Sequence, residues 1–301
     1  MIEEPAPGPP PRLSPRQERA ALFLLRALAP RVPRRVLPDP PAALAPFERF
    51  AIPRRGRPGS LAATWYPAAH SQPSGAVLLI HPWFEWGQAY FHRRGRIEAL
   101  RAAGYGVLTF DLGGFGASAP PAGLWDRDVE DALAALASRA PGLPLHLWGV
   151  SSGGYWSHMA LARGTAVQGA MFEDVSPHLI EWSGHTNPLL RPCNALFRSL
   201  LPHPHAYLDL RRHAPFLAVR AAAYVGGDQD RGIPAADTRH LAELAGAELR
   251  LVPGTGHLAA IKEDGEGIVA LGLRTFARAE RQGQPTRPGN HGGLPLQHRD
   301  R

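Results

Sequence analysis

Cysteine and lysine are almost absent from the sequence. Cys193 is the one cysteine among 301 residues, which excludes an internal disulfide and is compatible with a reducing cytoplasm. Lys262 is the one lysine, and we attribute the arginine bias to genome composition rather than to phosphate recognition. The apolar N-terminal stretch within residues 16–29 is too short and too charged to span a bilayer, and it lacks the layout of a signal peptide. We therefore expect a cytoplasmic protein.

The positive charge of the chain lies at its two ends. The formal net charge is +7. Residues 1–57 contribute +6, from eleven arginines and five acids, and residues 278–301 contribute +3, from five arginines and two acids, so the residues between them carry −2. No pattern of interleaved aromatic residues accompanies the charge, and we expect no nucleic-acid partner.

One domain accounts for most of the chain, whose length is near the upper limit for a single core. Strand-like and helix-like runs alternate from Gly75 to Phe276, which predicts an α/β fold with parallel strands and crossover helices. Residues 47–67 read as an antiparallel hairpin that opens the fold. Residues 126–140 have the apolar spacing of an amphipathic helix. We place the domain at residues 47–278.

The segments outside this alternation differ in kind. Residues 1–46 form an N-terminal extension with one helix, which can start at Ser14-Pro15. We expect this helix to pack on the domain, with weak contact to a membrane surface as the second interpretation. We expect residues 279–301 to form a disordered tail. Residues 176–215 do not continue the alternation of strand-like and helix-like runs, which favours a lid of short helices over this segment.

Histidines gather in this lid segment. They are His178, His185, His203, His205 and His213. A metal site would call for paired helical spacing or nearby cysteines, and the sequence has neither. We expect surface histidines and no metal.

A glycine-rich turn with a central serine follows a short apolar run. Residues 145–154 read as a buried strand that breaks into G-x-S-x-G around Ser151, with a helix after it. On such a turn the serine backbone is strained and its hydroxyl projects above the sheet edge. Gly149 and Gly153 let the backbones pass closely because they lack side chains. The Ser152 N–H, at the helix start, then points toward negative charge forming beside the Ser151 oxygen.

A base and an acid for this serine follow in the sequence. A serine hydroxyl is a poor nucleophile until a base takes its proton, and the base needs an orienting acid. Residues 221–234 read as a strand ending in a glycine turn with Asp228 and Asp230 at its mouth. Residues 248–257 read as a strand whose loop presents His257. The order is therefore serine, acid, histidine.

This order resembles that of the α/β-hydrolase family of serine hydrolases. The motifs that carry the resemblance are G-V-S-S-G, G-D-Q-D-R-G-I-P and P-G-T-G-H. The resemblance implies an α/β-hydrolase fold, a mostly parallel sheet with helices on both faces and a short lid insertion. It also implies a triad of Ser151, His257 and Asp230, the last through the pattern G-x-x-D-x-x-x-P. Asp228 is expected to cap the turn through its own backbone. Asp174, after the preceding apolar run, is the alternative acid.

The resemblance further implies an oxyanion hole formed by the Ser152 N–H and the loop after the strand at residues 75–80. Relatives usually carry His-Gly there, which maps onto His81-Pro82 and makes the Trp83 N–H the second donor. Because proline has no N–H and a fixed φ, Phe84 stays open as the alternative donor. We expect His81 to be structural.

Residues 88–118 resemble the lysophospholipase and monoacylglycerol-lipase branch of the family. We expect a helix over residues 88–105, closed by Gly104, and a turn formed by Asp111. The glycines at 113–116 also suggest a dinucleotide loop. That interpretation fails because G-x-G-x-x-G is incomplete and prolines follow in place of a helix.

Together these features predict a cofactor-free serine hydrolase that cleaves small-molecule carboxylic esters or thioesters through an acyl-enzyme. We expect an apolar pocket lined partly by the lid, with Trp83, Phe84 and Trp182 as substrate-pocket residues. One alternative is a cofactor-free haloperoxidase-like perhydrolase with the same triad. The other is a non-catalytic binding protein that keeps the fold.

Overall fold

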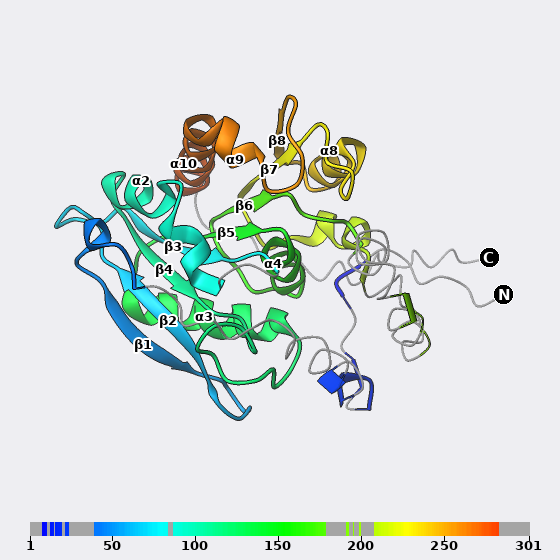
Figure 1. The fold of residues 1–301 in the computed structure, drawn as a ribbon, viewed down its shortest axis with the longest axis horizontal. Helices are drawn as coiled ribbons and strands as arrows, with labels where there is room; N and C mark the ends of the chain where they lie inside the picture. The colour runs from blue at the N-terminus through cyan, green and yellow to red at the C-terminus, as the bar shows by residue number, and fades with distance from the viewer. Residues whose placement is uncertain are drawn as a thin grey trace, which may run out of the picture.

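The computed structural model describes residues 8–10, 13–14, 16–19, 22–23, 39–83, 87–178, 191–192, 195, 199 and 208–282. Among them an eight-stranded sheet runs in the order β1-β2-β4-β3-β5-β6-β7-β8 (Figure 1). β1 pairs antiparallel with β2, and β2 with β4, whereas the other neighbouring pairs are parallel. The strands are β1 (Glu48–Pro53), β2 (Ser60–Tyr66), β3 (Gly75–Ile80), β4 (Tyr105–Phe110), β5 (Leu145–Val150), β6 (Gly169–Glu173), β7 (Ala221–Gly227) and β8 (Glu248–Val252).

Helices cover both faces of this sheet, so each face has its own apolar core. Helices on the first face are α3 (Trp125–Arg139), α4 (Ser152–Ala162) and α8 (Ala235–Leu244), with the short 3-10 turns η5 (Leu210–Arg212) and η6 (Ala214–Phe216). Those on the second face are η2 (Ala42–Leu44), η3 (Gly87–His92), α2 (Arg96–Ala102), α9 (Ala260–Glu263) and α10 (Gly265–Arg281).

The central strand β3 shows why the sequence forms a two-sided sheet. Its run Gly-Ala-Val-Leu-Leu-Ile is buried throughout. Successive side chains of a strand point to opposite faces. Accordingly Leu78 and Ile80 belong to the core under α3 and α4, whereas Val77 and Leu79 belong to the core under α2 and α10. A near-continuous apolar run is typical of a strand buried on both faces.

The hairpin at residues 47–67 and the helix at residues 126–140 are confirmed as β1–β2 and α3. The continuous helix expected over residues 88–105 is wrong. The segment forms the 3-10 turn η3, then breaks at Arg94 (φ 70°) and Gly95 (φ 69°) before α2 begins. The break follows from the anchoring of η3, whose Gln88 N–H donates to Asp111 Oδ1 at 2.8 Å. Gly104 does follow the end of α2, in left-handed backbone (φ 90°).

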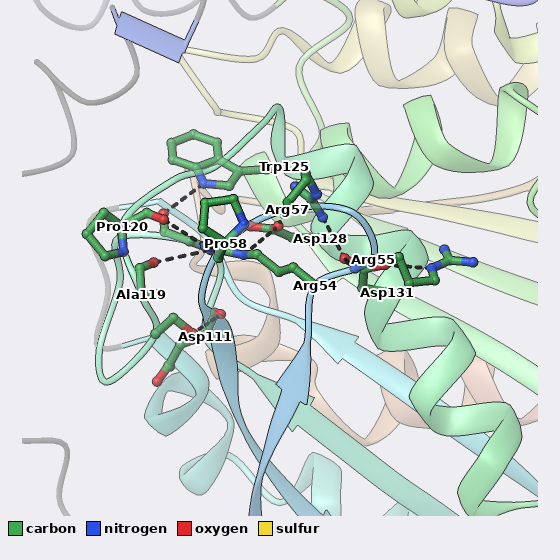
Figure 2. Close-up of polar contacts among 12 residues, drawn as sticks. Arg54, Arg55, Arg57, Pro58, Asp111, Ala119, Pro120, Trp125, Asp128 and Asp131 are labelled. Carbon is green, nitrogen blue, oxygen red and sulfur yellow. Dashed lines mark hydrogen bonds and ion pairs between the residues drawn. The ribbon is translucent and has the colours of Figure 1, made fainter.

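Arg54 at the tip of the β1–β2 hairpin is buried, although the arginines of the tip read as part of a basic end of the chain. Arg54 lies between loops and donates to the carbonyl oxygens of Pro120 (2.7 Å) and Ala119 (3.1 Å) (Figure 2). Its Nε lies 3.3 Å from Asp128 Oδ1, and both side chains have no exposed surface. Arg57 bridges Asp128 at 3.0 Å and Asp131 at 2.6 Å.

This network fixes the loop that follows β4 against α3. Asp128 Oδ2 accepts the Gly113 N–H at 2.9 Å, and the Trp125 Nε1–H donates to the Gly113 carbonyl at 2.8 Å. Gly113 has no room for a side chain, since a Cβ there would lie 2.4 Å from Arg54 Nη2. The hairpin, the loop and α3 are therefore held as one unit.

Described residues of the N-terminal extension contact the domain. Ser14 and Gln17 form a reciprocal cap at the start of helical residues 16–19: the Ser14 N–H donates to Gln17 Oε1 (2.9 Å) and the Gln17 N–H donates to Ser14 Oγ (3.4 Å). Leu13 packs against the first core, and Glu18 pairs with Arg127 of α3 at 3.0 Å. At these residues the extension packs on the domain. None of the helices in the described part of the chain combines the length and apolar character needed to cross a membrane.

Replacing Asp128 by alanine leaves two buried arginines without their shared partner. We expect Asp128→Ala to lower the free energy of unfolding by about 3–5 kcal/mol, measured by urea denaturation. Asp39→Ala, which breaks an exposed ion pair with Arg49, should change the unfolding midpoint little. Equal stability of Asp128→Ala and wild type would mean that the network contributes nothing to the fold.

Candidate active site

Ser151 stands between the end of β5 and the start of α4, in strained backbone. Its φ of 50° and ψ of −119° are rare for a residue with a side chain. Two glycines make this turn sterically feasible. A Cβ on Gly149 would lie 2.5 Å from the Gly154 Cα, and a Cβ on Gly153 would lie 2.5 Å from the carbonyl oxygens of Ile80 and His81. The expected strand–serine–helix turn is confirmed.

The same contacts bring the loop after β3 beside the start of α4. Ser152 is the first residue of α4 and is buried. The carbonyls of Ile80 and His81 face Gly153. Trp83 follows His81 by two residues and so lies close to this contact in the chain. The Trp83 ring packs edge-on against Trp125, with centroids 4.9 Å apart. Its expected role as an oxyanion donor, with Ser152, stays a prediction. Phe84 and Trp182 lie outside the described residues.

Three side chains from three strand ends form a continuous hydrogen-bonded chain. Ser151 Oγ lies 3.1 Å from His257 Nε2, and His257 Nδ1 lies 2.8 Å from Asp230 Oδ2. Asp230 follows β7 and His257 follows β8, and the carboxyl ends of parallel strands meet at one edge of the sheet. The structure therefore brings together all three residues that the sequence predicts for the triad.

The second oxygen of Asp230 is held by the backbone. Its Oδ1 accepts the N–H groups of Gly232 (2.8 Å) and Ile233 (2.9 Å). Burial favours the neutral acid, but the hydrogen bond and charge of His257 and these N–H groups outweigh burial and lower the pKa of Asp230. For His257 burial favours the neutral ring, yet the hydrogen bond to Asp230 and the charges of Asp174, Asp230 and Glu173 raise its pKa. Asp230 is thus ionised beside a strengthened base.

A second acid lies next to this chain. Asp174 is buried directly after β6, and its Oδ2 accepts the Leu258 N–H at 2.9 Å. Burial and the charge of Glu173 raise the pKa of Asp174 to about 7. Asp230, not Asp174, contacts His257 Nδ1 within hydrogen-bond distance, so the geometry favours Asp230 as the orienting acid.

His81, Asp111 and Asp228 were expected to have structural roles. His81 and Asp111 have the expected kind of role, whereas Asp228 has a different one. His81 Nε2 accepts the Leu112 N–H at 3.0 Å, and Asp111 accepts backbone N–H groups on both sides of its loop. Asp228 does not cap its own turn. Its Oδ1 accepts the Gly254 N–H at 2.7 Å and so joins the loops after β7 and β8, which lie next to each other because those strands pair.

The expectation of surface histidines in the lid is wrong at the two positions that the structure describes. His178 and His213 are each 1% exposed. His178 forms an isolated bridge with Asp209, and His213 Nδ1 lies 2.7 Å from the Gly8 carbonyl. His213 lies between Leu210 and Ala214, which belong to the first core, and the N-terminal residue Gly8 contacts it. The other three histidines lie outside the described residues.

Sequence reasoning missed a buried ion pair beneath the site. Arg96 Nη2 contacts both oxygens of Glu173 at 2.6 Å, and neither side chain has exposed surface. The guanidinium also lies 5.5 Å from the Trp148 ring centroid. Two consecutive acids at the end of an apolar strand were the available signal, because a buried carboxylate needs a partner.

One cluster of metal-ligating groups is present among the described residues: Asp174, Asp230 and His257, whose nearest polar atoms lie within 4.8 Å of one another. Asp230 and His257 are already bonded to each other, and Asp174 to a backbone N–H.

Comparison with known proteins supports the assignment of the fold. Residues 71–213 match the sequence model of the family described as serine aminopeptidase, S33. This match includes Ser151 and ends before Asp230 and His257. A comparison with curated proteins found no match. The sheet order and the serine turn are those of an α/β-hydrolase fold, and the family match includes that turn.

Solved structures show the same fold at low sequence identity. An esterase of Pyrococcus furiosus is 16% identical with a TM-score of 0.66, covering 83% of this chain and 98% of that one. A thermostable carboxyl esterase of Bacillus coagulans is 16% identical with a TM-score of 0.61, covering 76% and 99%. A Butyrivibrio proteoclasticus protein solved with ferulic acid is 17% identical with a TM-score of 0.60, covering 76% and 99%.

A methyl group at Gly153 should force the loop after β3 away from α4. We expect Gly153→Ala to lower the free energy of unfolding by about 1–3 kcal/mol because the clash is with backbone. Gly265→Ala is the matched control, since its Cβ would come no nearer than 4.0 Å to Ile261 Cδ1. Urea denaturation of both variants provides the measurement. A fully stable Gly153→Ala would show that this close approach is not required.

Proposed function

We propose that the chain is a serine hydrolase that cleaves carboxylic esters or thioesters through an acyl-enzyme. The observation that carries this proposal is the continuous chain from Ser151 Oγ through His257 to Asp230, with contacts of 3.1 and 2.8 Å. The solved structures of the same fold that are named as esterases support it. With a single cysteine in the sequence, a reducing compartment such as the cytoplasm is its expected location.

The hydrogen-bond directions suit the first chemical step. The Nδ1–H of His257 donates to Asp230, so Nε2 carries the lone pair that accepts the Ser151 proton. Ser151 Oγ then attacks the acyl carbon and the carbonyl becomes an oxyanion. Its collapse breaks the ester or thioester bond, and the leaving alcohol or thiol takes the proton from His257. Water repeats these steps on the acyl-serine and releases the acid.

The oxyanion would form at the N-terminus of α4. There the Ser152 N–H and the positive end of the helix dipole favour negative charge. The Trp83 N–H is the second donor in this proposal. The contact between Gly153 and the carbonyls of Ile80 and His81 supports it by bringing the two loops together.

Two other activities use the same residues, and a non-catalytic binding protein is the third alternative. The family match favours a second substrate class, amino-acyl amides, because of its description as serine aminopeptidase. A perhydrolase would use the same triad with peroxide and a carboxylic acid. A binding protein would keep the fold without turnover, and the assembled triad argues against it.

Loss of Ser151 or of His257 should abolish turnover. We expect Ser151→Ala and His257→Ala each to reduce kcat for p-nitrophenyl esters by about 10⁴-fold or more, and the double variant to be little worse, because triad residues act as a unit. Fluorophosphonate labelling of wild type but not of Ser151→Ala is the direct measurement. Labelling of Ser151→Ala, or its near wild-type turnover, would contradict the proposal.

The acyl chain should set the catalytic efficiency. For an apolar pocket we expect kcat/KM to rise from acetyl to octanoyl esters, since each buried methylene contributes about 0.8 kcal/mol, until the pocket is filled. The panel includes acyl-CoAs, amino-acyl p-nitroanilides, and peroxide with acetate. Flat activity along the ester series would refute the apolar pocket, and preference for the anilides would assign the second substrate class.

A further inference from the structure

Asp174 is held in an unusual backbone position beside the proposed base. It follows β6 directly, with φ of 52° and with its N–H donated to the Val225 carbonyl at 2.8 Å. Left-handed backbone is uncommon for residues other than glycine, asparagine and aspartate. The side chain is 1% exposed. A buried acid in strained backbone at this place calls for an explanation that the triad does not give.

The carboxylate of Asp174 fixes the peptide that follows His257. Its Oδ2 accepts the Leu258 N–H at 2.9 Å, while Arg94 Nη1 donates to the Leu258 carbonyl at 3.4 Å. Leu258 itself has φ of 58°, a conformation that its side chain disfavours and that must be imposed by its surroundings. The loop that presents His257 is therefore held from both sides directly after the histidine.

The charge of Asp174 has no cation of its own in the described part of the chain. Glu173 beside it is matched by Arg96, and Asp174 Oδ1 is buried without a hydrogen-bond partner. The polar atoms of Asp174, Asp230 and His257 lie within 4.8 Å of one another. The positive charge that forms nearest to Asp174 in the proposed reaction is the imidazolium of His257.

We propose that Asp174 is a positioning residue which anchors the His257 loop through the Leu258 N–H and stabilises the protonated ring of His257 by its negative charge. This role rests on the proposed function, and it adds a second carboxylate to the site. Asp230 orients the ring through Nδ1, and Asp174 acts on it through space and through the backbone.

The direction of the pH effect follows from the groups around Asp174. They are Glu173 on β6, Asp230 after β7, His257 after β8, and Tyr90 of η3 with Arg96 of α2. Burial, then Glu173, raise the pKa of Asp174 to about 7, and its charge raises the pKa of His257.

Activity needs neutral His257 in the free enzyme, so it falls as pH drops through the raised pKa. Removing the charge of Asp174 lowers that pKa and should move the acidic limb of the pH profile to lower pH.

The test compares four aspartate variants of the full-length protein, of which Asp230→Asn is the reference for loss of the orienting acid. Asp174→Asn keeps an oxygen for the Leu258 N–H and tolerates the left-handed backbone, but removes the charge. Asp174→Gly also tolerates the left-handed backbone, but it removes both the charge and the oxygen that accepts the Leu258 N–H. It is the second variant in case Asp174→Asn does not fold. Asp228→Asn is the matched control, because Asp228 accepts the Gly254 N–H of the same loop from an exposed position.

Two readouts are measured. The pKa of the His257 ring is followed by NMR of protein labelled in histidine, with its resonance assigned by its loss in His257→Ala. The pH profile of kcat/KM is recorded with the best ester. In Asp174→Asn we expect both midpoints to fall by about one pH unit. In Asp174→Gly we expect the same shift and an additional loss in kcat of about ten- to a hundred-fold, because the loop is released. Asp228→Asn should leave both midpoints in place.

Unchanged midpoints in Asp174→Asn, or an equal shift in Asp228→Asn, overturn the inference. A loss in Asp174→Asn as large as that in Asp230→Asn also overturns it, since Asp174 would then be the orienting acid. Absence of ester hydrolysis and of labelling in wild type counts against the proposed function alone, because the NMR titration still decides the effect of Asp174 on His257.

Discussion

The end of β6 connects the two halves of the candidate site. The Glu173 carbonyl accepts the Ser151 N–H at 2.7 Å, and the neighbouring Asp174 carboxylate accepts the Leu258 N–H at 2.9 Å. The two N–H donors, Ser151 and Leu258, both have left-handed backbone, as does Asp174. Strained backbone persists only where its surroundings determine it fully. One strand end therefore sets the geometry of the serine turn and of the histidine loop together, and a shift of β6 would displace both.

Buried charges are matched where they hold the fold together. Arg54 is matched by Asp128 under the hairpin tip, and Arg96 by Glu173 under the site. The desolvation of such pairs offsets much of their attraction, so their main effect is to fix which elements meet. Asp174 is different, because no arginine or lysine pairs with it among the described residues and its carboxylate lies within 4.8 Å of the His257 ring. A carboxylate left unmatched by arginine is available to respond to the charge that develops during catalysis.

Much of the site could be predicted because it depends on local patterns. The strand ends that carry Ser151, Asp230 and His257 lie at one edge of a parallel sheet, and glycine turns mark each of them. The burial of Arg54, Arg96, His178 and His213 could not be predicted in the same way. Each depends on a partner far away in the sequence, such as Asp128 for Arg54 or Gly8 for His213. The break before α2 likewise depends on Asp111, which captures Gln88 from another loop.

The loop that carries Pro82 is held by its neighbours. Proline cannot adjust φ or donate a hydrogen bond. His81 accepts the Leu112 N–H at Nε2, so its Nδ1–H donates to the Pro82 carbonyl at 2.8 Å. Burial lowers the pKa of His81 to about 4, which keeps this neutral tautomer near neutral pH. The Trp83 ring is fixed against Trp125. The neutral His81 and the packing of the Trp83 ring thus position the loop after β3 beside α4. There the close contact between Gly153 and the carbonyls of Ile80 and His81 leaves the backbone of this loop little freedom to move.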